Sequence, residues 1–175
     1  VRVLHPTSKE KVIFFLVNVP YGVQKMSGTI KGLVETSTNI GILKTFENEV
    51  LGSSSIRSSV ETARDSLSDK IAYLTEFLGG EYERQGVYPA WEYRKDSPLR
   101  DKMVEVYEEM YGQKPNVVAI HAGLECGLFY KKMEGLDCVS LGPDMKDIHT
   151  SEEVLSISST ERVWKYLVKV LGALK

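Results

Sequence analysis

Three segments of the sequence carry residues that can do chemistry, and the first surrounds His149. It reads DIHTSEE and follows an apolar run, with carboxylates at Asp147, Glu152 and Glu153 close by. Imidazole is the most common metal-binding side chain near neutral pH, so His149 is a candidate metal ligand. No His-x-x-x-His or Cys-x-x-Cys pattern accompanies it, and from spacing alone a surface histidine beside an acidic loop is the favoured interpretation.

The second segment is HAGLECG, which follows the apolar run Val117–Ile120. Glu125 lies near glycines there, and a carboxylate at the end of a strand can bind an amine or a metal. The alternative is a residue at a helix N-terminus that interacts with the helix dipole, and the two alternatives stay open. His121 is equally explained as a hydrogen-bonded polar residue. Cys126 has no obvious His/Asn partner set, so it is interpreted as a packing residue.

Arg57 is a third candidate, at the end of a predicted strand of small polar residues, SSSIRSS. The forked guanidinium of an arginine at this position can bind a carboxylate through two hydrogen bonds. A solvated residue on an exposed strand explains the same position at least as well, so the assignment stays open.

A strand–helix–strand unit is predicted to position His149 and Glu125. The runs Val117–His121 and Val139–Leu141 are predicted to be neighbouring parallel strands, with a short helix between them. Polar residues collect where each run ends, and ligands bind at that edge in open α/β sheets. We therefore expect Glu125 and His149 to share one cleft at this edge.

The first half of the chain predicts an antiparallel sheet covered by a helix. The strands are predicted from apolar runs and turn signals over Lys11–Val19, Thr29–Glu35, Asn39–Phe46, Ser53–Ser58 and Glu81–Tyr88. A helix is predicted from Ser59 to Leu78, because apolar residues recur there every three or four positions. Ser58 and Glu61 fit a capping box at its start.

The second half contains two longer predicted helices. Asp96-Ser97-Pro98 indicates the start of one, since proline is favoured in the first turn. Its buried face is predicted to be Leu99, Met103, Val106, Tyr107 and Met110. The last helix is predicted over Ser158–Leu171, with a buried face of Trp164, Leu167, Val168 and Leu171. The change of pattern predicts a domain boundary near residues 90–96, and the fold class is α/β.

Composition excludes several classes of function. The chain has 175 residues and a net charge of -2, which does not favour nucleic acid as a partner. Two cysteines do not make a secreted disulfide framework, so a reduced, cytoplasmic setting is expected. No apolar run approaches the roughly 20 residues of a membrane helix. The chain begins at Val1, in mid-pattern, so a piece of a longer protein is expected.

Four segments, in this order, resemble one family. They are VPYGVQKMSGTIKGLVETSTNIGI, SSSIRSSVETARD, AIHAGLECGLFYKKMEGLDCVSLGP and DIHTSEEVLSI. The resemblance is to the aminoacyl-histidine dipeptidases, cytosolic exopeptidases with two zinc ions, and it covers nearly the whole chain. It implies an α+β lid portion at residues 1–92, of the kind used for dimerisation. Residues 93–175 would be the C-terminal part of an α/β catalytic domain.

The resemblance also implies roles for four residues. His149 would be the last zinc ligand, and Glu125 would face the amino group of the peptide. Arg57 would reach from the lid to the substrate carboxylate, and Gly123 would place a backbone group beside the substrate. The resemblance further implies a small peptide substrate of the Xaa-His type, zinc as cofactor, and a homo-oligomer formed through the lid.

The chain departs from the family pattern in one important respect. The other zinc ligands and the catalytic base belong to an His-x-Asp motif, a bridging aspartate and a Glu-Glu pair, and these have no matching context here. One histidine cannot hold two cocatalytic zinc ions. The parent protein is therefore predicted to be an enzyme and this chain alone to be inactive. The alternative is a non-catalytic dimerisation or binding module, or an inactive relative.

Overall fold

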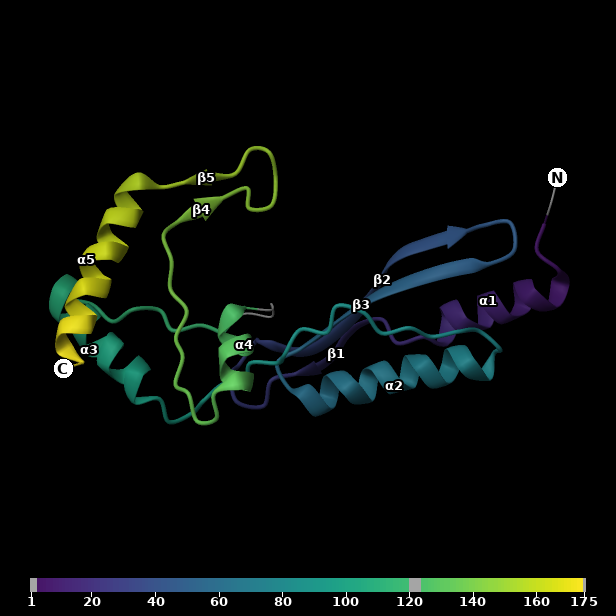
Figure 1. Cartoon of the computed structure of the whole chain (residues 1–175), viewed down its shortest axis with the longest axis horizontal. Coiled ribbons are helices and arrows are strands. Elements are labelled where there is room, and N and C mark those ends of the chain that lie inside the picture. The colour runs from purple at the N-terminus through teal and green to yellow at the C-terminus, as the bar shows by residue number, and fades with distance from the viewer. Residues whose placement is uncertain (1–2, 120–123, 175) are drawn as a thin grey trace. The chain divides into compact units, whose positions relative to one another are not determined.

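The computed structural model describes residues 3–119 and 124–174 and is shown in Figure 1. By its internal contacts the chain divides into two compact units. The first comprises Val1–Tyr93 and Ala119–Leu128, and the second Arg94–Val118 and Phe129–Lys175. The assignment of residues 1–92 to a lid and of 93–175 to a catalytic domain stays a prediction. Within the described ranges, no helix is both long and apolar enough to cross a membrane.

The first unit contains a three-stranded antiparallel sheet in the order β1-β2-β3. Its strands are β1 (Gly22–Met26), β2 (Val34–Thr45) and β3 (Val50–Ser58). Helix α2 (Glu61–Phe77) follows and contacts β3. Leu67 and Ile71 on α2 are 4% and 3% exposed. The predicted fold class, helices with an antiparallel sheet, is thereby confirmed, and α2 matches the predicted helix closely.

The run predicted as a strand over Lys11–Val19 is instead helical up to Asn18, as part of α1 (Pro6–Asn18), and Val19 is the C-cap. A continuous apolar run does not by itself distinguish a strand from a helix. Local signals decide for the helix, because Pro6 occupies its first position and His5 accepts a hydrogen bond from the backbone N–H of Thr7 at 3.4 Å. None of the residues of α1 is buried.

Three further strand predictions need correction. The predicted strand Thr29–Glu35 is wrong up to Leu33, because the chain turns there and β2 begins only at Val34. From Val34 the strand β2 passes without interruption through Thr36-Ser37-Thr38 into the run predicted over Asn39–Phe46. The strand β1 was not predicted. Glu81–Tyr88 has no strand in the structure. Side chains of α2 hydrogen-bond to this segment instead, so tertiary contacts take the place of a β-ladder.

In the second unit, helices α3 (Pro98–Tyr111) and α5 (Ile157–Ala173) pack on each other. Their shared core contains Met103 and Val106 from α3, and Tyr166 and Val170 from α5. The buried hydroxyl of Tyr166 donates to the carbonyl of Met103 at 2.7 Å. The predicted start and buried face of α3 are therefore confirmed.

The predicted buried face of α5 is wrong. Trp164, Val168 and Leu171 are 63%, 51% and 57% exposed, whereas Tyr166 and Val170 are buried. The helix carries apolar side chains on two sides, and periodicity cannot tell which side packs on α3. The helix also begins one residue earlier than predicted, at Ile157, because Ser156 caps it by accepting from the backbone N–H of Ser159.

Around the predicted strand–helix–strand unit, the helix is present as α4 (Glu125–Lys132). In the described residues neither Val117–Ala119 nor Val139–Leu141 forms a strand, so the two neighbouring parallel strands are not found. Apolar runs form strands only beside a hydrogen-bonding neighbour, and Val118 is 66% exposed. The remaining predicted residues, Ile120 and His121, lie outside the described ranges.

Candidate functional site

His149 lies in the loop of a small hairpin formed by β4 (Met145–Lys146) and β5 (Val154–Leu155). Its side chain is exposed, and its backbone is left-handed with φ 69°. Such conformations cost non-glycine residues about 1–3 kcal/mol and persist where surrounding contacts hold them. Here the backbone N–H of His149 donates to the carboxylate Oε2 of Glu153 at 2.8 Å. Glu153, which the sequence analysis named only as a nearby carboxylate, therefore closes the loop through its hydrogen bond to the backbone of His149.

The hairpin is anchored to the N-terminus of α5 through Asp144. The backbone N–H of Asp144 donates to the Oγ of Ser159 at 2.8 Å, and Ser159 is 3% exposed. The Asp144 carbonyl accepts from the N–H of Ser156 at 3.0 Å. Arg162 adds an ion pair to the Asp144 carboxylate at 3.3 Å. Helix α5 therefore sets where the hairpin begins and ends.

The described residues contain no group of three or more His, Cys, Asp or Glu side chains that could hold a metal ion. Two cocatalytic zinc ions require several protein ligands and a bridging water. His149 offers one imidazole, so the residues of the chain that the structure describes do not fit a complete dizinc site.

Glu125 is the first residue of α4, and its side chain is exposed. A carboxylate in the first turn interacts favourably with the positive end of the helix dipole. Its neighbour is Tyr88, a residue that sequence reasoning missed. Partial burial raises the pKa of the Tyr88 phenol, and charge interactions with Glu125 and Cys126 raise it further. The structure thus brings together a carboxylate and a phenol that lie far apart in sequence.

Gly127 lies two residues beyond Glu125 and is buried. A Cβ atom at this position would lie 2.9 Å from the carbonyl oxygen of Pro89 and 3.5 Å from the Cβ of Trp91. Real Cβ atoms essentially never come as close as 2.9 Å, so the contact depends on glycine. The segment after Tyr88 is therefore the surface on which the first turn of α4 rests.

The other predicted residues are Arg57, Gly123, His121 and His149. Arg57 is exposed on β3, opposite Ser37 of β2. Gly123 and His121 lie outside the described residues. His149 belongs to the second unit, whereas Glu125 belongs to the first. The expectation that they share one cleft stays a prediction.

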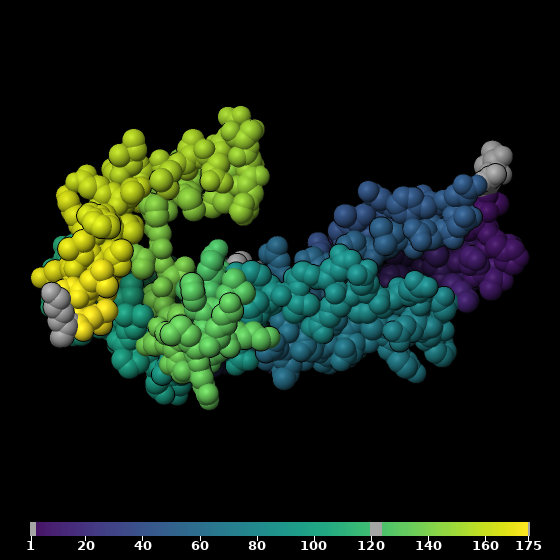
Figure 2. Space-filling model, viewed as in Figure 1, coloured from purple at the N-terminus to yellow at the C-terminus, as the bar shows by residue number. Residues whose placement is uncertain are grey.

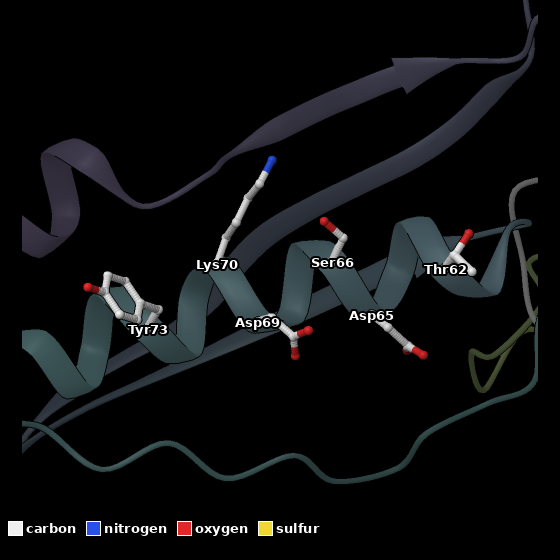
Figure 3. A pocket seen from close by; sticks show the side chains of 6 residues that line it. All are labelled: Thr62, Asp65, Ser66, Asp69, Lys70 and Tyr73. Atoms are coloured by element: carbon white, nitrogen blue, oxygen red, sulfur yellow. The ribbon is translucent and has the colours of Figure 1, made fainter.

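A surface hollow of about 620 Å³ lies in the first unit, but its lining does not resemble a substrate site. Figure 3 shows that all the side chains around it come from α2. They are Thr62, Asp65, Ser66, Asp69, Lys70 and Tyr73. None is a predicted site residue, and a hollow on a single helix has no opposing wall to hold a ligand.

Comparison with known proteins finds similarity to dipeptidases. The chain is 35% identical over 164 residues to the cytosol non-specific dipeptidase of Escherichia coli (strain K12). The aligned region covers 94% of this chain and 34% of that protein. The crystal structure of aminoacylhistidine dipeptidase from Vibrio alginolyticus matches with a TM-score of 0.87 and 36% identity. That match covers 99% of this chain and 35% of the other. The resemblance to the aminoacyl-histidine dipeptidases is confirmed.

A third protein shares the fold at low sequence identity. Aminopeptidase PepT from Bacillus cereus ATCC 10987 matches with a TM-score of 0.71 and 15% identity, over 95% of this chain and 45% of that one. No family model matches the sequence. The chain spans about a third of the length of its dipeptidase relatives.

Proposed function

We propose that the chain is the C-terminal part of a zinc-dependent, cytoplasmic dipeptidase that hydrolyses Xaa-His-type dipeptides. The observation that supports this proposal is the homology to two dipeptidases over nearly the whole chain, at 35% and 36% identity. The zinc ligands and base missing from the 175 residues would belong to the remaining part of the enzyme.

The proposed residue roles follow the charges of a dipeptide. Glu125 faces the peptide amino group, because its exposed carboxylate is complementary to an ammonium. Arg57 binds the peptide carboxylate from the first unit, and Gly123 contributes a backbone group beside the substrate. His149 serves as one zinc ligand. Holding both ends of the substrate contributes to catalysis by positioning, and none of the four residues is the catalytic base.

The proposal includes a homo-oligomer formed through residues 1–92. In the order β1-β2-β3, both β1 and β3 are edge strands of the described sheet. Edge strands present unpaired backbone groups that seek partners. The same edges favour the alternative function, a non-catalytic dimerisation or binding module. Sedimentation of the purified chain tests the oligomer, and a monomer at high concentration would contradict it.

Hydrolysis assays separate the enzyme from the binding module. We expect the purified chain with added zinc to show no cleavage of a Xaa-His dipeptide and only weak zinc binding. We expect the complete enzyme to cleave it, and His149→Ala to abolish most of that activity. His5→Ala is the control, because His5 only caps α1, and it should change little. A complete enzyme that lacks activity with zinc, or retains it in His149→Ala, would contradict the proposal.

A further inference from the structure

The segment Gly80–Trp91 returns along α2 without forming a strand, and Figure 2 shows the two lying together on one surface. Three contacts made by α2 side chains hold it there. The hydroxyls of Ser68 and Tyr82 are hydrogen-bonded at 2.8 Å, and Arg84 pairs with Asp65. The third contact is the 2.7 Å hydrogen bond from Nη1 of Arg64 to the carbonyl of Tyr88.

Arg64, which makes the third contact, is a buried residue. It is 8% exposed, although arginine is seldom buried without partners. Its guanidinium donates to Asp65 at 3.0 and 2.9 Å and to Glu61 at 3.0 Å. The planar fork of donors is therefore fixed on α2 by two carboxylates, and its remaining arm holds the Tyr88 carbonyl in one place.

Helix α4 packs against the residues directly after Tyr88. The carbonyl oxygens of Pro89 and Ala90 and the Cβ of Trp91 surround Gly127. Glu125 begins the same helix two residues earlier. Because a helix is a stiff element, a shift of this segment or of Gly127 moves the Glu125 carboxylate as well.

We propose that Arg64 and Gly127 are positioning residues for Glu125, because Arg64 fixes the backbone at Tyr88 and Gly127 seats α4 on the adjoining segment. The positioning of Glu125 by Arg64 and Gly127 is inferred from contacts within the first unit. Only the consequence for substrate rests on the proposed function, in which Glu125 faces the peptide amine. A misplacement of about 1 Å at such a group can cost about 100-fold in rate.

The test uses the Tyr88 phenol as a reporter of where Glu125 lies. The 175-residue chain is prepared with ¹³Cζ-labelled tyrosine, and Tyr88→Phe assigns one of its nine tyrosine signals. In the wild-type chain, Glu125→Gln should lower the titration midpoint of Tyr88, because it removes a nearby negative charge. In the Arg64→Lys and Gly127→Ala backgrounds, this effect of Glu125→Gln should be lost.

Matched controls carry the same substitutions elsewhere. Arg162→Lys changes an exposed arginine on α5, and Gly172→Ala adds a methyl group to a helical glycine that has open space around it. The effect of Glu125→Gln on Tyr88 should persist in both. The inference is overturned if Glu125→Gln shifts the titration midpoint of Tyr88 by the wild-type amount in the Arg64→Lys and Gly127→Ala backgrounds. The two variants act on opposite sides of the contact, so if one fails to fold the other decides.

Kinetics of the complete enzyme then separate this inference from the proposed function. Glu125→Gln, Arg64→Lys and Gly127→Ala should each lower the preference, in kcat/KM, for a free dipeptide over its N-acetylated form. A merely structural role would lower kcat/KM equally for both substrates. If the Tyr88 reporter responds as expected but Glu125→Gln leaves the preference unchanged, the proposed role of Glu125 fails and the positioning stands.

Discussion

Replacing Ser97 by alanine removes a capping group at which two hydrogen bonds of the second unit meet. The Oγ of Ser97 accepts from the backbone N–H of Arg100 at 3.1 Å, which caps the N-terminus of α3. The same hydroxyl donates to the Asp137 carboxylate at 2.7 Å. Ser97 is 3% exposed, so water cannot replace these partners without a rearrangement.

The expected loss of stability is the sum of these two interactions. An N-cap serine is worth typically about 1 kcal/mol relative to alanine. A hydrogen bond to a charged group contributes about 1.5–3 kcal/mol. The lower end applies here, because Asp137 keeps its second partner, the backbone N–H of Leu99 at 3.0 Å. We therefore expect Ser97→Ala to lower the free energy of opening of α3 by about 2.5 kcal/mol.

Hydrogen exchange of the α3 amides measures this free energy for one helix, without requiring the whole chain to unfold in a single step. The matched control is Ser156→Ala, which removes the cap of α5. Ser156 accepts from the N–H of Ser159 at 3.3 Å, and the other partner of its hydroxyl is a neutral group, the hydroxyl of Ser158 at 3.3 Å. It should cost α5 about 1 kcal/mol. Equal losses in the two helices, or a loss under about 0.5 kcal/mol at α3, would refute the reasoning.

Two further predictions concern single contacts. Tyr166→Phe removes the buried hydrogen bond to the Met103 carbonyl, and it should lower the free energy of unfolding of the second unit by about 1 kcal/mol in urea titrations. An unchanged midpoint would argue against that bond. The hydrogen bonds of Arg84 and Arg64 lower the pKa of Asp65. The resulting stabilisation is therefore complete above the ordinary carboxyl pKa of about 4 and is lost as pH falls through the lower folded value. Asp65→Asn should weaken this acid dependence in thermal unfolding between about pH 5 and pH 2, and an identical pH profile would contradict the assignment.

Several elements could be read from the sequence because their signals are local. Helix α3 begins at Pro98 after the Ser97 cap and ends at Tyr111, where the C-cap Gly112 has a left-handed φ of 70°. Helix α2 followed from an apolar stripe that repeats every three or four residues. Propensity, capping and periodicity depend on residues within one or two turns, and a single sequence contains all of that information.

Other elements depended on contacts that no local pattern encodes. Helix α5 has two apolar sides, of which only the one with Tyr166 packs on α3. Val139–Leu141 reads as a strand, but the described residues provide no neighbouring strand. In each case the alternative structures satisfy the local pattern equally, and contacts with another part of the chain determine which one forms.

The candidate site divides in the same way. Residue type, loop position and family resemblance were enough for the sequence to nominate His149, Glu125 and Arg57. Their surroundings could not be derived from the sequence. The phenol of Tyr88 lies near Glu125, and Arg64 holds the Tyr88 carbonyl from 24 positions away. Such contacts form only when distant segments are packed together, because burial then forces each polar group to find a partner.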